Sequence, residues 1–322
     1  MFLAVLAVVV GLLILVRSAD EFVEGSVNTA NYFKISPLII GMVIMGFGTS
    51  LPEMLVSAIS SFEGSPGIAV GNAYGSNIAN IGLILGVTAL ISPVLIHSSV
   101  IKKELPTLTV VTIIATTQAL DGTVTRFESI ALLVVFALIM FWTLKSELKK
   151  TTKGSESVEK KEENKQVAPI SRSIFQIIAG LVLLLLSSRA VVWGAVKIAL
   201  FFGVSDMVVG LTIVAIGTSL PEFASSLSAI KKQEHDIVIG NILGSNLFNT
   251  LVVVGIAGCI SPLHLSFEVL TRDITLMATF TLSIFFFGWN FGKKGKISRL
   301  GGGVLVTAYL LYIAYLMFAS FS

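Results

Sequence analysis

The chain has 322 residues, of which 54% are hydrophobic and only 13% are charged, and its mean hydropathy is +0.92. Soluble domains carry about 25% charged residues, so this composition excludes an ordinary soluble protein and predicts an integral membrane protein. The net charge of +3 is small, and the basic residues lie in a few connecting segments, which argues against nucleic-acid binding. The single cysteine, Cys259, excludes an intrachain disulfide.

Apolar runs of about 20 residues, long enough to cross about 30 Å of hydrocarbon, recur along the whole chain. The first run lacks a basic start and a cleavage site, so it is predicted to be a membrane helix and not a signal peptide. We expect an all-α integral membrane protein. Ten transmembrane helices are predicted near residues 1–17, 37–60, 68–92, 104–120, 127–145, 173–192, 206–230, 236–260, 273–290 and 300–320.

The two halves of the chain repeat one another. When Gly11 is placed on Gly180, the segment Gly11–Pro93 aligns with Gly180–Pro262 without a gap. Two motifs coincide in this register. Gly48-Thr-Ser-Leu-Pro-Glu53 meets Gly217-Thr-Ser-Leu-Pro-Glu222, and Gly71-Asn-Ala-Tyr-Gly-Ser-Asn77 meets Gly240-Asn-Ile-Leu-Gly-Ser-Asn246.

Each half contains five predicted helices, and five is an odd number. The second copy must therefore enter the membrane in the opposite direction. Inverted repeats of this kind are typical of secondary transporters, whose sites lie near the midplane between the copies. We divide the chain into a first five-helix repeat (1–145), a polar linker (146–168) and a second, inverted five-helix repeat (169–322).

The distribution of lysine and arginine predicts the orientation. With the N-terminus outside, the segments expected in the cytoplasm contain 18 of the 22 basic residues. The excess remains when the long linker is left out of the count. We therefore predict a multi-pass protein of the cell membrane, surrounded by the lipid bilayer, with both termini extracellular and the linker cytoplasmic.

Two acidic residues lie deep in apolar sequence. Glu53 and Glu222 each occupy the second span of a half, with no lysine or arginine nearby. A carboxylate inside the membrane is costly and indicates a functional site. A lone glutamate of this kind could be a protonated structural residue, but its duplication together with the flanking motif favours a site that a cation or a proton neutralises.

Oxygen-bearing residues accompany both acids. Thr49 and Ser50 precede Glu53 by about one helical turn and share its face. Pro52 and the neighbouring glycines are expected to free backbone carbonyls from the helical ladder. An all-oxygen set without histidine or cysteine suits hard cations such as Ca²⁺ and Na⁺. Besides the two glutamates, the predicted ligands are Thr49, Ser50, Ser76 and Asn80 in the first half and Thr218, Ser219, Ser245 and Asn249 in the second.

These motifs resemble the two alpha repeats of the Na⁺/Ca²⁺ exchanger branch of the Ca²⁺/cation antiporter superfamily, and the resemblance covers nearly the whole chain. It implies that the predicted ligands line the cation sites and that Gly46 and Ala215 add backbone carbonyls. It also implies that the first and sixth helices slide across a core of broken helices. Members that depend on K⁺ resemble this chain but have Asp in place of Asn249, so the resemblance implies exchange without K⁺.

We therefore expect a secondary antiporter that exchanges Na⁺ for Ca²⁺, with electrogenic transport if a third Na⁺ is carried. We expect no cofactor beyond the transported ions and no obligatory protein partner. Two alternatives stay open: a Ca²⁺/H⁺ antiporter of the same fold, which a pH gradient would drive, and a passive cation channel, which would need no counter-ion gradient. No nucleophile–base pair or nucleotide motif accompanies the acids, which argues against an enzyme.

Overall fold

The structure, a computed structural model, describes residues 1–152, 169–203, 215–288 and 295–321. Seven of the described helices are long and apolar enough to cross a membrane, and the bent pair Pro37–Thr49 and Leu51–Phe62 can form an eighth span. Of the two other spans expected from the sequence, the fourth, near 104–120, begins with Glu104 directly after Lys102 and Lys103, and the seventh lies partly outside the described residues.

The first half contains membrane-crossing helices, several of them interrupted by a wider π-helical turn (η), and two short strands. Its elements are α1 (Phe2–Phe33), α2 (Pro37–Ile40), η1 (Gly41–Met45), α3 (Gly46–Thr49), α4 (Leu51–Phe62), α5 (Pro66–Ala79), η2 (Asn80–Leu85), α6 (Gly86–Ile91), β1 (Val94–Ile96), η3 (Val100–Glu104), α7 (Leu105–Ala119), β2 (Thr123–Val124) and α8 (Arg126–Thr152).

The second half repeats this order in its described parts. Its elements are α9 (Ile170–Phe201), α11 (Ala215–Thr218), α12 (Leu220–Lys231), α13 (His235–Leu247), η5 (Phe248–Val253), α14 (Val254–Ile260), β3 (Leu263–His264), η6 (Val269–Ile274), α15 (Thr275–Gly288), β4 (Gly295–Ile297) and α16 (Arg299–Phe321).

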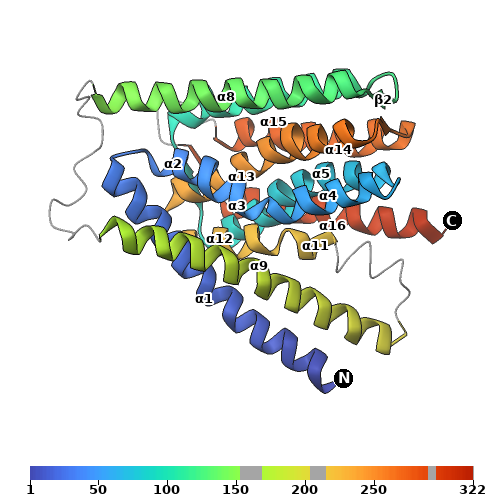
Figure 1. Cartoon of the computed structure of the whole chain (residues 1–322), viewed down its shortest axis with the longest axis horizontal. Coiled ribbons are helices and arrows are strands. Elements are labelled where there is room, and N and C mark those ends of the chain that lie inside the picture. The colour runs from blue at the N-terminus through green and yellow to red at the C-terminus, as the bar shows by residue number, and fades with distance from the viewer. Residues whose placement is uncertain (153–168, 204–214, 289–294, 322) are drawn as a thin grey trace.

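Helices α1 and α9 are each 32 residues long, well beyond the predicted spans 1–17 and 173–192. The polar residues at 17–33, where we expected the helix to have ended, continue it because they bond to neighbouring helices. Gln176 Nε2, for example, donates a hydrogen bond of 2.8 Å to Glu21 Oε2. Figure 1 shows α1 and α9 crossing each other at one side of the bundle.

Repeat-related glycines bring α1 and α9 close together. A Cβ placed on Gly180 would lie 2.7 Å from the backbone nitrogen of Phe22, so a larger residue there would force the backbones apart. One on Gly11 would lie 3.3 Å from the backbone nitrogen of Val191, which is tighter than most real Cβ contacts. The two glycines therefore permit the backbones to approach, as small residues commonly do between membrane helices.

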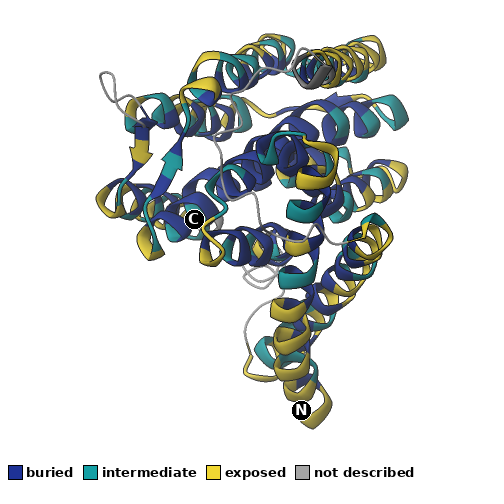
Figure 2. Cartoon of the chain, turned by 90° about the vertical axis from the view of Figure 1, so that its left-hand side faces the viewer, coloured by how far each residue is buried: buried dark blue, intermediate teal, exposed yellow. Residues whose placement is uncertain are grey.

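The broken helices form the centre of the bundle. Most residues of the span His235–Ile260 are buried and none is exposed, whereas most of α8 and α16 faces outward. In Figure 2 the buried residues gather in the middle and the exposed ones lie on the outer helices and along the N-terminal part of α1. A helix that is apolar on all sides can be buried in this way because its neighbours supply the surrounding surface.

Two short antiparallel sheets connect the halves. In one, β1 pairs with β4 and Val94 lies opposite Ile297; in the other, β2 pairs with β3 and Val124 lies opposite Leu263. Since β1 and β2 flank the helix η3–α7, the two sheets lie at opposite ends of the bundle. Each half thus contributes one strand to each end.

Two arginines also form hydrogen bonds between the two halves. Arg126, at the start of α8, donates a hydrogen bond of 3.1 Å to the carbonyl of Ile260 at the end of α14. Arg299, at the start of α16, donates one of 3.3 Å to the carbonyl of Ile91 at the end of α6. The last helices of the two halves therefore correspond with Arg126 on Arg299, a slightly larger offset than the one that places Glu53 on Glu222.

The sheet pairing predicts which connections share a side of the membrane. Single cysteines at His264 in β3 and at Lys296 in β4, introduced after Cys259→Ser, should react with a membrane-impermeant thiol reagent from opposite sides of sealed vesicles. Both positions are exposed, so reagent access is not limited by packing. Labelling of both cysteines from the same side would contradict the arrangement.

Candidate cation-binding site

The site begins with a break in the second span of each half. α3 gives way to α4 at Ser50, where the paired segments bend by 42°, and α11 gives way to α12 at Ser219. Pro52 and Pro221 follow these serines, and each proline lacks an N–H and obstructs the carbonyl four residues earlier. A new helix therefore starts just after each serine, in the interior of the bundle.

The breaks place both glutamates in the first turn of a helix. Glu53 lies in the first turn of α4 and Glu222 in the first turn of α12. A helix N-terminus stabilises a nearby carboxylate by about 0.3 to 1 kcal/mol, and by up to about 2 kcal/mol when partly buried. On insertion scales a charge at the bilayer centre costs about 3 kcal/mol. The helix ends therefore offset only part of the cost.

The carboxylates are buried and incompletely hydrogen-bonded. Glu53 is 0% exposed and Glu222 is 1% exposed. Ser76 Oγ donates a bond of 3.5 Å to Glu53 Oε1, and Ser50 Oγ donates one of 3.4 Å to Glu222 Oε1. Within the described residues, the Oε2 atom of each glutamate has no hydrogen-bond partner, and neither carboxylate forms a salt bridge.

Other oxygen atoms in the same region share this lack of partners. Asn80 donates through Nδ2 to Asn246 Oδ1 at 2.9 Å, which leaves its own Oδ1 free, and neither amide atom of Asn249 has a partner among the described residues. Ser219 Oγ is also buried and unpartnered there. Buried polar atoms are nearly always hydrogen-bonded, so such a group of exceptions calls for a ligand.

Contacts between the two halves place hydroxyl groups of one half beside those of the other. Thr49 and Ser245 are both fully buried, and their hydroxyl oxygens lie 3.3 Å apart. Gly46 makes this approach possible, since a Cβ there would lie 2.9 Å from the carbonyl carbon of Gly244. The structure thus gathers the first-half Thr49, Ser50 and Glu53 with residues of α12 and α13.

The remaining predicted ligands lie on α11, directly before the second break. Ala215 is its first residue and Thr218 its last, and Thr218 is half-buried where its counterpart Thr49 is fully buried. The two half-sites therefore differ in this structure.

The glycine faces of the two third spans differ as well. Gly244 of α13 packs against the backbone of Met42. For Gly71 and Gly75 of α5, no described heavy atom lies within 4 Å of an added Cβ. In the register of the repeat, the counterparts of α2 and η1 are residues 206–214, which lie outside the described residues.

Two further asparagines hold the glutamate-bearing turns, and the sequence prediction omitted them. Asn72 Nδ2 donates to the carbonyl of Glu53 at 3.1 Å, and Asn241 Nδ2 donates to the carbonyl of Glu222 at 3.4 Å. Each amide also donates to serine hydroxyls about one turn further along the glutamate's helix: Asn72 to Ser57 in α4, and Asn241 to Ser225 and Ser226 in α12. The duplicated Gly-Asn dipeptides, one turn before Ser76 and its counterpart, are the signal that could have identified them.

The arrangement suits a hard cation. Two carboxylates, several hydroxyls and amide carbonyls supply only oxygen, which Ca²⁺ takes six to eight at a time and Na⁺ also prefers. Among the described residues no group of three or more His, Cys, Asp or Glu side chains is placed to hold a metal ion, so neutral oxygens would complete any coordination shell.

Comparison with known proteins agrees with this chemistry. The chain matches the family described as "Sodium/calcium exchanger protein" over residues 3–145 and 172–318. It is 41% identical to CaxA of Alkalimonas amylolytica over 320 residues, which are 99% of this chain and 100% of that protein. It is 25% identical to the sodium/calcium exchanger MaX1 of Methanosarcina acetivorans, covering 97% of this chain and 98% of that one.

A solved structure has the same fold. The sodium-calcium exchanger NCX_Mj, soaked with Na⁺ and Ca²⁺, superimposes with a TM-score of 0.84 at 33% identity, over 98% of each chain. The fold is therefore the all-helical membrane architecture of ten spans in two inverted repeats, as the sequence predicted. The family consists of secondary transporters and not of enzymes. This chain belongs to the sodium/calcium exchanger family.

Proposed function

We propose that this multi-pass membrane antiporter exchanges Na⁺ for Ca²⁺ at the site between Glu53 and Glu222. One observation carries the proposal: two buried carboxylates lie among unpartnered oxygens, without a cationic side chain bonded to either in the described part of the chain. A transported cation supplies the missing charge. The twelve residues predicted from the sequence are the proposed ligands.

Charge balance explains why the two ions compete. Two carboxylates neutralise one Ca²⁺ or two Na⁺, so the site cannot be filled by both at full occupancy without excess positive charge. A third Na⁺, held by hydroxyls and carbonyls alone, would make each cycle electrogenic. Antiport follows from this competition. On each side of the membrane one kind of ion must leave the site before the other can bind, and the site then carries the new ion to the opposite side.

Asn249 supports exchange without K⁺. Its amide is buried and both of its polar atoms lack partners among the described residues. An amide offers a neutral carbonyl oxygen to a cation but no charge. Co-transport of K⁺ with Ca²⁺ would require a further negative charge, and the third spans of both halves carry asparagine, Asn80 and Asn249, at this position.

Alternating access is proposed to use α1 and α9. Both helices lie against the breaks. A Cβ on Gly48 would lie 2.9 Å from a methyl group of Leu181 of α9 and 3.4 Å from the ring of Phe22 of α1, and one on Gly217 would meet the side chain of Val192 of α9. A shift of α1 and α9 along the core would uncover one end of the site and cover the other. The proposed orientation has both termini extracellular and the linker, with β1 and β4, on the cytoplasmic side.

A flux measurement tests the proposal. In proteoliposomes loaded with Na⁺ and diluted into Na⁺-free buffer, uptake of ⁴⁵Ca²⁺ should far exceed that of protein-free liposomes. With the membrane voltage clamped, replacing external K⁺ by a large inert cation should leave the rate unchanged.

Other outcomes of this measurement point to the alternatives. Uptake that a pH gradient drives equally well without Na⁺ would identify a Ca²⁺/H⁺ antiporter. Uptake without any counter-ion gradient would identify a channel. A requirement for K⁺ on the Ca²⁺ side would contradict the interpretation of Asn249.

A further prediction concerns the asparagines that hold the glutamate-bearing turns. Asn241→Ala should raise the half-saturating Ca²⁺ concentration of exchange by about tenfold or more, as is usual when a residue that orients a metal ligand is lost. The matched change Asn72→Ala should have a smaller effect, because Asn241 is fully buried and also accepts a bond from Thr49, whereas Asn72 is half-buried.

Thermal unfolding of both variants provides the control. Each should remain folded in detergent, and the maximal exchange rate should change less than the half-saturating concentration. An unchanged half-saturating concentration for Asn241→Ala in a folded protein would show that the amide does not position the site.

A further inference from the structure

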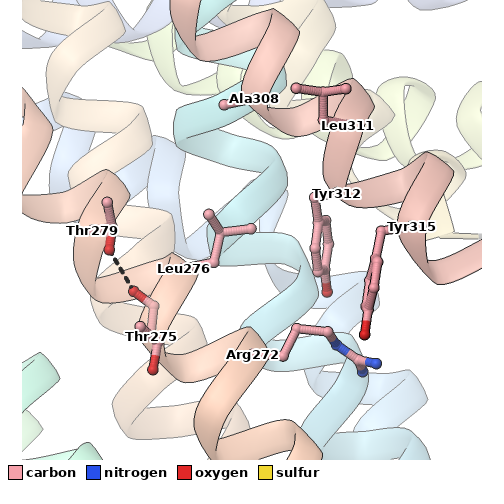
Figure 3. A pocket seen from close by; sticks show the side chains of 8 residues that line it. All are labelled: Arg272, Thr275, Leu276, Thr279, Ala308, Leu311, Tyr312 and Tyr315. Atoms are coloured by element: carbon pink, nitrogen blue, oxygen red, sulfur yellow. Dashed lines mark hydrogen bonds between the residues drawn. The ribbon is translucent and has the colours of Figure 1, made fainter. Parts of the chain in front are cut away.

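A groove of about 400 Å³ lies on the outer surface of the bundle, between η6–α15 and α16. It is far from Glu53 and Glu222 in the sequence, and no step of the proposed exchange uses it. Figure 3 shows that its two ends differ in chemistry: the guanidinium of Arg272 and the hydroxyls of Tyr312 and Tyr315 lie toward one end, and Ala308 and Leu311 toward the other.

The polar end is built around a buried carboxylate. Arg272 donates through Nε and Nη2 to the two oxygens of Asp273, at 2.7 and 3.0 Å, and the hydroxyl of Tyr312 donates to the same carboxylate at 2.9 Å. A guanidinium has five N–H donors in a planar fork. The bonds to Asp273 fix its orientation and leave other donors for an anionic oxygen in the groove.

The groove runs from the headgroup level of a membrane toward its interior. Arg272 lies near the beginning of the span Val269–Gly288, just after β3, and Leu276 follows one turn deeper. On α16, Tyr315 lies near the end of the helix, and Leu311 lies one turn deeper and is 67% exposed. Arginine and tyrosine at the interface, with leucine below, match the order of phosphate and acyl chain in a phospholipid.

The repeat contains a counterpart at the other end of the bundle. Lys103 and Glu104 correspond to Arg272 and Asp273 in the register that aligns the two glutamates, and Trp142 corresponds to Tyr315 in the register that aligns α8 with α16. There the Lys103 amine lies 4.7 Å from the centre of the Trp142 ring and 3.5 Å from Glu104. A base, a buried acid and an aromatic side chain therefore recur at both membrane surfaces.

We propose that this groove binds one phospholipid molecule. Its phosphate accepts hydrogen bonds from the Arg272 guanidinium and the Tyr315 hydroxyl, and one acyl chain lies along Leu276 and Leu311. Arg–phosphate bonds are charge-assisted and often paired, which gives the contact both strength and a defined geometry. The lipid joins α15 to α16 at the surface where Tyr312 already connects them.

The bound lipid would also support a helix that contacts the proposed cation site. Met277, one turn after Asp273, accepts a contact of 3.3 Å from Asn77 Nδ2, and Asn77 is the neighbour of Ser76 in the proposed cation site. A lipid that fixes the start of α15 therefore supports a helix in direct contact with α5. This role does not depend on which ion drives exchange.

Native mass spectrometry of the purified protein in detergent tests the proposal. The probes are dioleoylphosphatidylethanolamine, dioleoylglycerol with the same acyl chains but no phosphate, and inorganic phosphate. The most tightly bound phospholipid should bind about tenfold more strongly than dioleoylglycerol, which corresponds to the loss of hydrogen bonds to a charged group. Inorganic phosphate should not compete with it.

Two variants distinguish lipid binding in the groove from lipid binding elsewhere on the protein surface. Thr279→Trp fills the groove without altering Asp273, and it should weaken the tightest lipid binding about tenfold. Leu186→Trp is the control, because Leu186 lies on α9, outside this groove and outside the counterpart formed by Lys103, Glu104 and Trp142, and is 61% exposed. It should bind lipid as the wild type does.

A double substitution tests the polar end. Arg272→Gln together with Asp273→Asn removes both charges at once and leaves no unpaired buried carboxylate, so the protein should fold and lose the preference for phospholipid over dioleoylglycerol. Equal binding of both lipids by the wild type, equal effects of Thr279→Trp and Leu186→Trp, or displacement by inorganic phosphate would each overturn the proposal.

Discussion

Two carboxylates buried at the centre of a membrane bundle, with no basic side chain paired to either in the described structure, are the constraint on which the rest of this protein depends. On insertion scales each costs about 3 kcal/mol, and the sum is comparable with the net stability of a typical domain, about 5 to 15 kcal/mol. The helix breaks, the proline after each break and the asparagines that hold Glu53 and Glu222 all serve to keep these groups in place. What they leave uncompensated is the negative charge that, in the proposed function, the transported cation neutralises.

The inverted repeat explains how the chain brings two such groups together. One half supplies one carboxylate, three hydroxyls and one amide, which is too little charge for a divalent ion. The second half, inserted in the opposite direction, brings the same set to the same depth from the other side. The sheets and the arginine contacts at the ends of α6 and α14 exchange partners between the halves, so the copies cannot separate without loss of these contacts.

The copies are not equivalent in detail. Thr49 is fully buried and lies against Ser245 and Asn241, while Thr218 is half-buried. A transporter with exact two-fold symmetry would face both sides equally. In the proposed alternating access, unequal packing of equivalent residues would set the side to which the site opens, and exchange of the two environments between the halves would reverse that side.

Much of this could be predicted from the sequence because the signals are strong and local. Spans follow from hydropathy, one constant offset aligns both motifs of the first half with those of the second, and a glutamate in apolar sequence indicates a site. The twelve predicted ligands lie on the elements that meet at the two breaks, although their role as ligands stays a prediction.

Other features could not be predicted, for physical reasons. Helix α1 continues well past residue 17 because its polar residues bond to α9 and α12, as Glu21 does to Gln176 and Asp20 to Ser228. Hydropathy does not reveal such contacts. The roles of Asn72 and Asn241 depend on which carbonyl each amide reaches across a helix boundary. The correspondence of Trp142 with Tyr315 was hidden because the offset between the halves increases slightly before the last helix.

Equilibrium binding of ⁴⁵Ca²⁺ to the purified protein tests the central claim most directly, because it measures the site without transport. We expect one Ca²⁺ to bind per chain, to be displaced by Na⁺ with a Hill slope above one, and to be lost in Glu53→Gln and in Glu222→Gln. Glu63→Gln, at an exposed glutamate just after α4, should bind as the wild type does. Normal Ca²⁺ binding by either buried-site variant, or Ca²⁺ binding that Na⁺ does not displace, would contradict the proposed site between the two glutamates.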